Sequence, residues 1–190
     1  MVMTRIAAPA VEPVTLAEAK AHLRVTDTAE DVLIANLIKA AREEVEAAAG
    51  IALISQDWRL YLDCWPPSGI VRLRKHPVQS VIQVTVYNLE GIAESIVPPA
   101  PNLDRATQPA RFAVPDTAKA PGRAMNGIEI DFRAGFGDTG VDVPDGLKRA
   151  MLLLVGHWFE HRGAQGSDSQ AASWPEGFDR IIERHRRMEL

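Results

Sequence analysis

The spacing of apolar residues changes twice along this chain, and these changes limit the folds it can adopt. A helical spacing holds over residues 15–49, an alternating spacing over 58–133, and a helical spacing returns after Pro144. Alternation places one face of a strand in a core, whereas positions three and four apart form one face of a helix. The pattern predicts an α+β fold: a small bundle of three to four helices, an inserted antiparallel β-region and a tethered C-terminal helix.

Helices are predicted over residues 15–24, 29–49 and 145–162. Thr15 and Glu18 have the spacing of a capping box at the start of the first helix. Gly50 is expected to end the second helix, because glycine adopts the left-handed conformation without steric cost. The third helix carries Leu152 and Leu153 beyond its main apolar stripe. We therefore expect it to be central and buried.

The β-insertion is predicted over residues 51–134, with strands around 58–62, 71–74, 82–86 and 128–133. A hairpin turn is expected at residues 88–91. Residues 95–126 contain six prolines, and proline cannot donate a hydrogen bond to a sheet. Most of this segment is therefore predicted to be a loop that projects as an arm, with one short strand near 111–114.

The C-terminal part is predicted as a flexible linker at 163–174 and a helix at 175–190, beyond a single folded domain over 1–162. A helix of this length is marginal alone in water, so its apolar stripe needs a groove. One interpretation is a helix that docks on another protein; the other is a solvated amphipathic face. The candidate docking residues are Phe178, Ile181, Ile182, Arg184 and Arg187.

The composition narrows the possible functions. A net charge of −4 argues against a generic binder of nucleic acid or anionic membranes, which needs excess Lys and Arg. Cys64 is the only cysteine, so no internal disulfide forms, and we expect a buried or partly buried thiol. No apolar run is long enough for a membrane span, and residues 1–10 do not resemble a signal peptide, so a cytoplasmic product is expected.

One pattern suggests an enzyme. His157, Glu160 and His161 fit the H-x-x-E-H motif, which can hold a zinc ion on one helix face with the glutamate as general base. A catalytic zinc needs a third protein ligand, and the residues after His161 offer only Asp168, Glu176, Asp179 and Glu183. A zinc-dependent hydrolase is kept as the alternative to a chain without catalytic, cofactor or metal residues. A third hypothesis is a DNA-packaging accessory protein that grips DNA through the C-terminal arginines.

The order of several short segments resembles the phage head–tail connector (adaptor) family. The resemblance covers residues 13–162, and the final helix matches more loosely. The segments are Pro13–Arg24, Asp31–Ile34, Pro77–Val81, Ile130–Gly137, Leu147–Ala150 and Trp158–Arg162.

The resemblance implies a structural, non-enzymatic subunit of a bacteriophage, a prophage-derived particle or a gene transfer agent, located at the head–tail interface of the virion. Such proteins form a ring, usually dodecameric, below the portal protein. The ring receives stopper or tail-end proteins on its far side, and DNA passes through its lumen. A net acidic subunit fits such a channel, because like charge keeps DNA mobile. The last helix would bind the portal.

Overall fold

A computed structural model describes residues 2–96, 102–161 and 174–186 of the chain. Its elements follow the predicted order of helices, strands and helices, which confirms the α+β class. Contacts divide the chain into two compact units. The sheet unit comprises Met1–Ala10 and Ser55–Phe136, and the helical unit comprises Val11–Ile54 and Gly137–Leu190. No described helix is long and apolar enough to cross a membrane.

The described residues of the helical unit form four α-helices, α1 (Leu16–Leu23), α2 (Asp31–Ala49), α3 (Asp145–Glu160) and α4 (Phe178–His185). The predicted capping box is present, since Thr15 and Glu18 each accept a hydrogen bond from the other's backbone N–H, at 2.7 and 3.2 Å. Gly50 ends α2 with a φ of 71°. Helices α1 and α4 each contact both α2 and α3.

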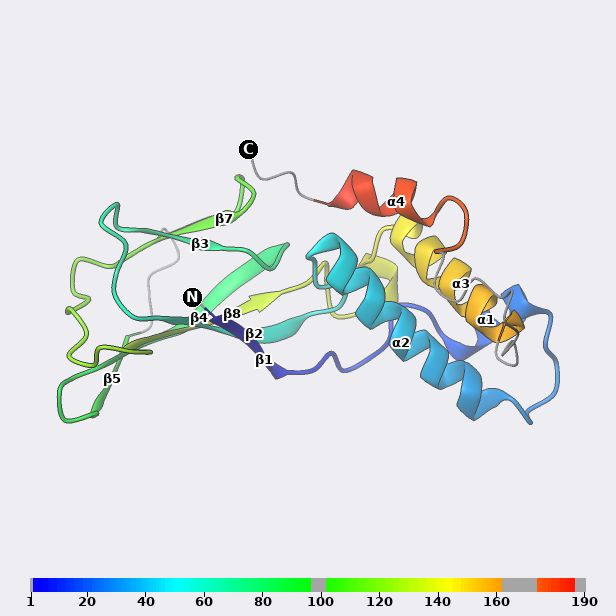
Figure 1. Cartoon of the computed structure of the whole chain (residues 1–190), viewed down its shortest axis with the longest axis horizontal. Helices are drawn as coiled ribbons and strands as arrows, with labels where there is room; N and C mark the ends of the chain where they lie inside the picture. Colours follow the sequence, from blue (N-terminus) through cyan, green and yellow to red (C-terminus); the bar gives the residue numbers. More distant parts are fainter. Residues whose placement is uncertain (1, 97–101, 162–173, 187–190) are drawn as a thin grey trace, which may run out of the picture. The chain divides into compact units, whose positions relative to one another are not determined.

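The core of the helical unit lies between α2 and α3 (Figure 1). Their facing side chains recur at helical spacing and are almost fully buried, and each of the larger ones (Ile, Val, Leu and Met) contributes about 1.5–3 kcal/mol through removal of apolar surface from water. These side chains are Ile34, Ile38, Ala41 and Val45 of α2, and Leu147, Ala150, Met151 and Leu154 of α3.

The sheet unit contains two antiparallel sheets. The larger has the order β1 (Val2–Ala7), β2 (Gln56–Leu62), β8 (Ile128–Ala134), β4 (Val78–Tyr87) and β5 (Ala93–Ile96). The smaller has the order β3 (Ile70–Leu73), β7 (Ala110–Ala113) and β6 (Leu103–Asp104), and Figure 1 draws it as a separate layer over the larger sheet.

The core of the sheet unit follows from the alternation along β8. Ile128, Ile130 and Phe132 are fully buried, as predicted, and Leu60 and Val84 lie opposite Ile130 on the two neighbouring strands. The other face carries ion pairs. Arg59 contacts Asp131 through two bonds of 2.6 and 2.8 Å, and Arg133 contacts Asp57 at 2.7 and 3.0 Å.

Two features of the sheet unit depart from the expectation. Strand β1 was not predicted, because its residues are nearly all exposed and show no apolar alternation. The segment 95–126 is not a projecting arm, because β7 pairs with β3 and Phe112 is fully buried. Proline removes a donor only at its own position, so the four residues between Pro109 and Val114 still form a strand. The predicted strand near 111–114 corresponds to β7.

Helix α3 also differs from the prediction. Leu152 and Leu153 are only half-buried, so α3 is covered on one side and open on the other. The predicted linker at 163–174 lies outside the described residues except for Trp174, whose ring centroid is 4.3 Å from that of Phe178.

Candidate interaction surfaces

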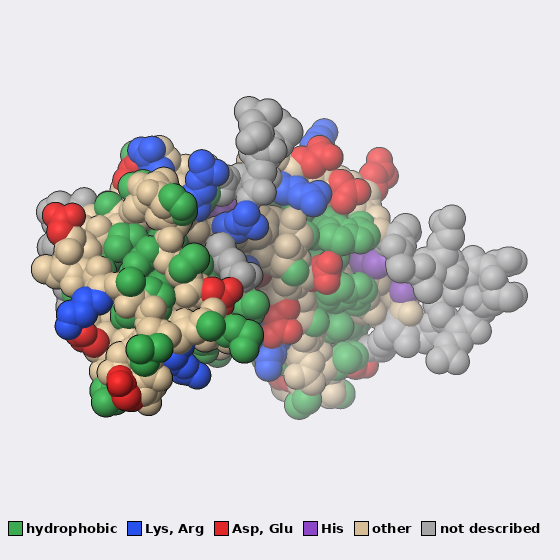
Figure 2. Space-filling model, turned by 60° about the vertical axis from the view of Figure 1, so that its left-hand side comes forward, with side chains coloured by type: hydrophobic (Ala, Val, Ile, Leu, Met, Phe, Trp, Pro, Cys, Tyr) green, Lys and Arg blue, Asp and Glu red, His purple; other side chains and the backbone are tan. Residues whose placement is uncertain are grey.

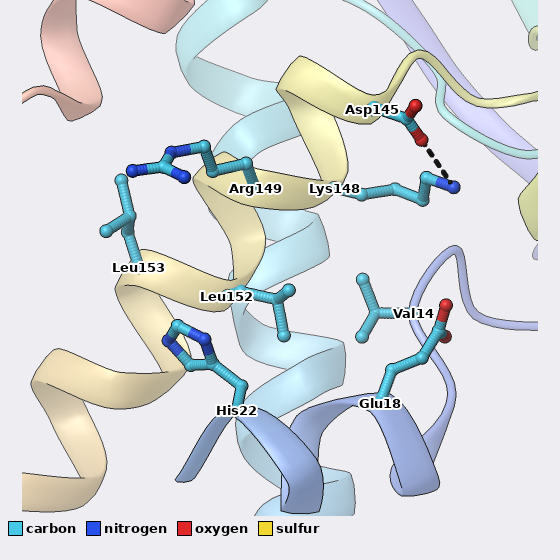
Figure 3. Close-up of a pocket in the computed structure, with 8 residues that line it drawn as sticks. All are labelled: Val14, Glu18, His22, Asp145, Lys148, Arg149, Leu152 and Leu153. Carbon is cyan, nitrogen blue, oxygen red and sulfur yellow. Dashed lines mark ion pairs between the residues drawn. The ribbon is translucent and has the colours of Figure 1, made fainter.

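Two hollows flank the open side of α3 and share Arg149 and Leu153. The first lies between α1 and α3 and is lined by eight residues drawn in Figure 3. The second lies between α3 and the start of α4 and includes Arg180 and Ile181. We name the first the α1–α3 groove; its lining is Val14, Glu18, His22, Asp145, Lys148, Arg149, Leu152 and Leu153.

The α1–α3 groove has an apolar floor and a charged rim. Val14, Leu152 and Leu153 supply the floor, and Figure 3 shows Leu152 and Val14 directed toward each other. On the rim, Lys148 Nζ lies 2.9 Å from Asp145 Oδ1. Arg149 is exposed and forms no ion pair within the described part of the chain. Such a surface suits a protein segment that brings apolar side chains and an acidic group.

The carboxylate of Glu18 lines the groove and also caps helix α1. It accepts hydrogen bonds from the Thr15 hydroxyl and backbone N–H, both at 2.7 Å. These bonds from Thr15 lower the pKa of Glu18 below its ordinary value. The rim thus carries two acidic groups, Glu18 and Asp145, and two basic groups, Lys148 and Arg149, of which Arg149 has no ion pair among the described residues.

The C-terminal helix is packed on its own chain. Phe178 and Ile182 are buried, and α4 contacts α2 and α3. Ile181 is half-buried and Arg184 is exposed, whereas Arg187 lies outside the described residues. The predicted docking residues thus divide into two that hold α4 in the helical unit and two that face outward.

A second apolar surface lies at the end of the β4–β5 hairpin. The hairpin tip, defined as residues 88–92, presents Leu89 and Ile92 with 82 and 65% of their surface exposed. Figure 2 shows apolar side chains (green) at the surface of the sheet unit, on the left of that view. Exposed large apolar side chains gathered at one turn mark an interaction site more often than scattered single ones.

The outer face of the smaller sheet is basic. Arg72 of β3 lies directly opposite Arg111 of β7, and both side chains are exposed. Asp104 accepts hydrogen bonds from Arg111 at 2.6 and 3.0 Å, but Arg72 has no ion pair among residues 2–96, 102–161 and 174–186. Like charges opposite each other destabilise a sheet, so the Arg72–Arg111 pair slightly lowers the stability of the smaller sheet.

The H-x-x-E-H residues do not form a metal centre with the residues described. His157 and His161 lie one turn apart, with ring centroids 4.5 Å apart, and a ring nitrogen of His161 lies 2.8 Å from the His157 carbonyl oxygen. No group of three His, Cys, Asp or Glu that could hold a metal occurs in the part of the chain described. Asp168, one candidate third ligand, lies outside that part. The zinc hydrolase is not supported.

The expectation for Cys64 is wrong, because its thiol is exposed. It lies two residues after β2, where the chain leaves the sheet ahead of Pro66. The glycine-rich residues 135–139 connect β8 to a short 3-10 helix at Gly140–Asp142. Thr139 and Asp142 form a capping box there, with bonds of 2.7 and 3.0 Å to the Asp142 carboxylate.

Residues 13–97 match the model of the phage gp6-like head-tail connector protein family. The resemblance to head–tail connectors is confirmed. The search of curated proteins finds no match for this chain.

Three solved structures are similar to this chain over its whole length. A chain in the virion of a native gene transfer agent (GTA) particle is 26% identical, with a TM-score of 0.78. A chain in the neck of an empty GTA particle, computed with C6 symmetry, is 28% identical, with a TM-score of 0.79. A chain in the neck of a native GTA particle, computed with C12 symmetry, is 27% identical, with a TM-score of 0.75. Each alignment covers 100% of this chain and 97% of the other.

Proposed function

We propose that this protein is a structural head–tail connector subunit in the neck of a phage or gene transfer agent particle. The observation that carries the proposal is the similarity over the entire chain to proteins in GTA necks. The family and the solved relatives are structural parts of particles, and the described residues offer no metal centre. The proposed role is assembly without catalysis.

The proposal includes a ring of copies around a DNA channel. Support comes from the C6 and C12 symmetry of the related necks. A ring requires two different complementary surfaces on each subunit. The two units differ in net charge, which supports such complementary surfaces. The sheet unit carries ten Lys and Arg against eight Asp and Glu, whereas the helical unit carries 11 Lys and Arg against 17 Asp and Glu.

The portal protein and the stopper or tail-end proteins are the proposed neighbours of the ring. For the portal we propose the outward residues of the C-terminal segment, Ile181 and Arg184, together with Arg187. Phe178 and Ile182 serve the same contact indirectly, because their burial holds α4 in place. This division follows from exposure: a side chain packed against its own core cannot also fill a groove on a partner.

The test is reconstitution with the portal protein of the same particle. Purified protein is mixed with portal, and complexes are counted by electron microscopy; rings coaxial with the portal are the expected result. Deletion of residues 175–190 is expected to leave a folded protein that no longer binds portal, and Ile181→Asp with Arg184→Glu should do the same without uncovering the core. Portal binding by both variants would overturn the docking assignment, and absence of the wild-type protein from particles would overturn the function.

A further inference from the structure

We propose that in the assembled ring the hairpin tip of one copy seats in the α1–α3 groove of the next copy. The proposal rests on the proposed function, because it assigns the contact that joins neighbouring subunits. Its two halves are surfaces described above on different units of the chain: the hairpin tip at residues 88–92, and the groove lined by Leu152 and Leu153.

The tip is an ordered support for exposed apolar groups. The Asn88 side chain accepts a hydrogen bond from Ile92 N–H at 2.8 Å, and Asn88 N–H donates to the Ile92 carbonyl at 3.1 Å. Behind the turn, Gly122 N–H donates to the Tyr87 carbonyl at 2.8 Å. A turn held this way loses little conformational freedom on binding, so burial of Leu89 and Ile92 would contribute to association nearly in full.

The groove offers the complementary shape and polarity. It is a hollow of about 460 Å³ with Val14, Leu152 and Leu153 on its floor. Both leucines are half-buried although they lie on the central helix of the unit. Covering them with the side chains of a partner removes apolar surface from water on both proteins.

Charge fixes the orientation of the two surfaces. Glu90 lies between Leu89 and Ile92 in the turn, is exposed, and has no ion pair in the described ranges of the chain. At the open end of the groove, Arg149 is exposed and equally unpaired in those ranges, beside the Lys148–Asp145 pair. An acid carried between two apolar side chains matches a guanidinium beside two leucines, and opposite charges select the correct register on encounter.

A second copy is the occupant that these observations favour. A turn and a groove on one chain, different in shape and carrying Glu90 on one and Arg149 on the other, produce a heterologous contact, which closes into a ring when the rotation allows. The related necks have C6 and C12 symmetry, which a repeated heterologous contact generates. A symmetric dimer would instead need each surface to match itself.

A charge swap tests the pairing directly. Glu90→Arg and Arg149→Glu are each expected to lower the fraction of protein in rings by about tenfold or more, since like charges then meet across the contact. The double variant is expected to restore rings. Asp116→Arg, a charge reversal at an exposed residue of the same unit, is the matched control and should assemble like the wild type. Ring fractions are read by native mass spectrometry and electron microscopy, with thermal melting to confirm folding.

The apolar half has its own test. Leu89→Ser with Ile92→Ser should abolish rings while leaving the melting temperature unchanged, because both side chains are exposed in the subunit. Rings in both single charge variants, or failure of the double variant to restore them, would overturn the proposal. Tip variants that keep rings but lose portal or tail proteins would overturn it too, by assigning the tip to another partner. In each case wild-type rings in particles would leave the connector function standing.

Discussion

Arg42 and Glu46 form an ion pair on α2, 3.0 Å between Nη1 and Oε2, in which both side chains are almost completely buried. Arg42 Nε also lies 2.8 Å from Glu12 Oε2, and Glu46 Oε1 accepts a hydrogen bond from Leu53 N–H at 2.8 Å. Burial opposes the charge of Arg42, but the hydrogen bond to Glu12 and the attraction of Glu46 outweigh it and raise its pKa. The pair links α2 to the segments before α1 and after Gly50.

Removal of one partner should therefore be costly. Glu46→Ala is expected to lower the free energy of unfolding by about 3 kcal/mol, because it leaves Arg42 short of a partner and Leu53 N–H without an acceptor. Urea unfolding monitored by circular dichroism measures this. Glu44→Ala on the same helix is the control, since Glu44 is only half-buried, and it should change stability by less than about 0.5 kcal/mol. Equal losses would contradict the argument.

Gly140 gives a steric prediction. A Cβ atom there would lie 2.5 Å from the Pro13 carbonyl oxygen, a backbone atom that cannot yield easily. Gly140→Ala should destabilise the helical unit by about 1–3 kcal/mol through overpacking. Gly156→Ala is the contrasting change: its nearest neighbour is the His22 ring at 3.4 Å, so helix propensity should stabilise α3 by about 0.5–1 kcal/mol. Thermal melting of both variants compares the two, and a loss of stability in Gly156→Ala would refute the contrast.

The sequence correctly predicted those elements whose residue pattern reflects burial or capping. The apolar periodicity of α2 and β8 matches their buried faces, which carry Ile34 and Ile130, and the capping box at Thr15 lies where it was expected. Strand β1 could not be found this way, since an edge strand with exposed side chains shows no alternation. Phe112 was assigned to an arm because the prolines around it obscured a four-residue strand.

The candidate site was less accessible to sequence reasoning. The α1–α3 groove combines Val14 and His22 with Lys148 and Leu152, which are far apart in the chain, and only the packing of α1 on α3 brings them together. The apolar excess at Leu152 and Leu153 was a usable signal, but it was interpreted as burial. Likewise, the apolar stripe of α4 indicated a contact without saying whether the surface belonged to a partner or to the same chain.

The packing of α4 leads to a prediction about Phe178. Phe178→Ala should detach α4 from α2 and α3. The free energy of unfolding should fall by about 3–5 kcal/mol, because Phe178 is fully buried. Hydrogen exchange of the amides of residues 178–185 should then become much faster, while those of α2 keep their protection. Ile181→Ala, which alters a half-buried neighbour, should have a much smaller effect. Protection that persists in Phe178→Ala would show that α4 is held by other contacts.

The opposed arginines of the smaller sheet predict a stabilising change. Arg72→Thr removes a positive charge from beside Arg111 and adds a β-branched residue, so the melting temperature should rise, corresponding to about 0.5 kcal/mol. The gain should shrink in high salt, which screens exposed charges. Arg133→Thr should lower stability, because Arg133 pairs with Asp57. A fall in stability for Arg72→Thr would indicate a favourable role for Arg72 in the isolated subunit.

His185 predicts a dependence on pH. Burial, and to a smaller extent the positive charge of Arg184, lowers the pKa of His185 in the folded protein. The unfolded chain, with an ordinary pKa near 6.5, binds the proton first as pH falls. Stability from the neutral imidazole is thus complete above pH 6.5 and is lost on acidification toward the lowered folded pKa.

Helix α4 should therefore show faster hydrogen exchange at pH 5.5 than at pH 7.5, after correction for the intrinsic rates. His185→Gln, which cannot take up a proton, is expected to remove this difference. If the glutamine variant loses protection on acidification as the wild type does, another group is responsible.

A parallel bridge joins Ile54 to Gly137, the last and first residues of the two segments that build the helical unit. The 82 residues between them leave and re-enter that unit at neighbouring points. Because both ends of this insert are held together by the bridge, the insert can become longer or shorter, or be exchanged, without displacing the helices of the helical unit. Homologous particles could thus vary the sheet unit to suit new neighbours, provided that residues 1–10 change along with it to keep β1 paired.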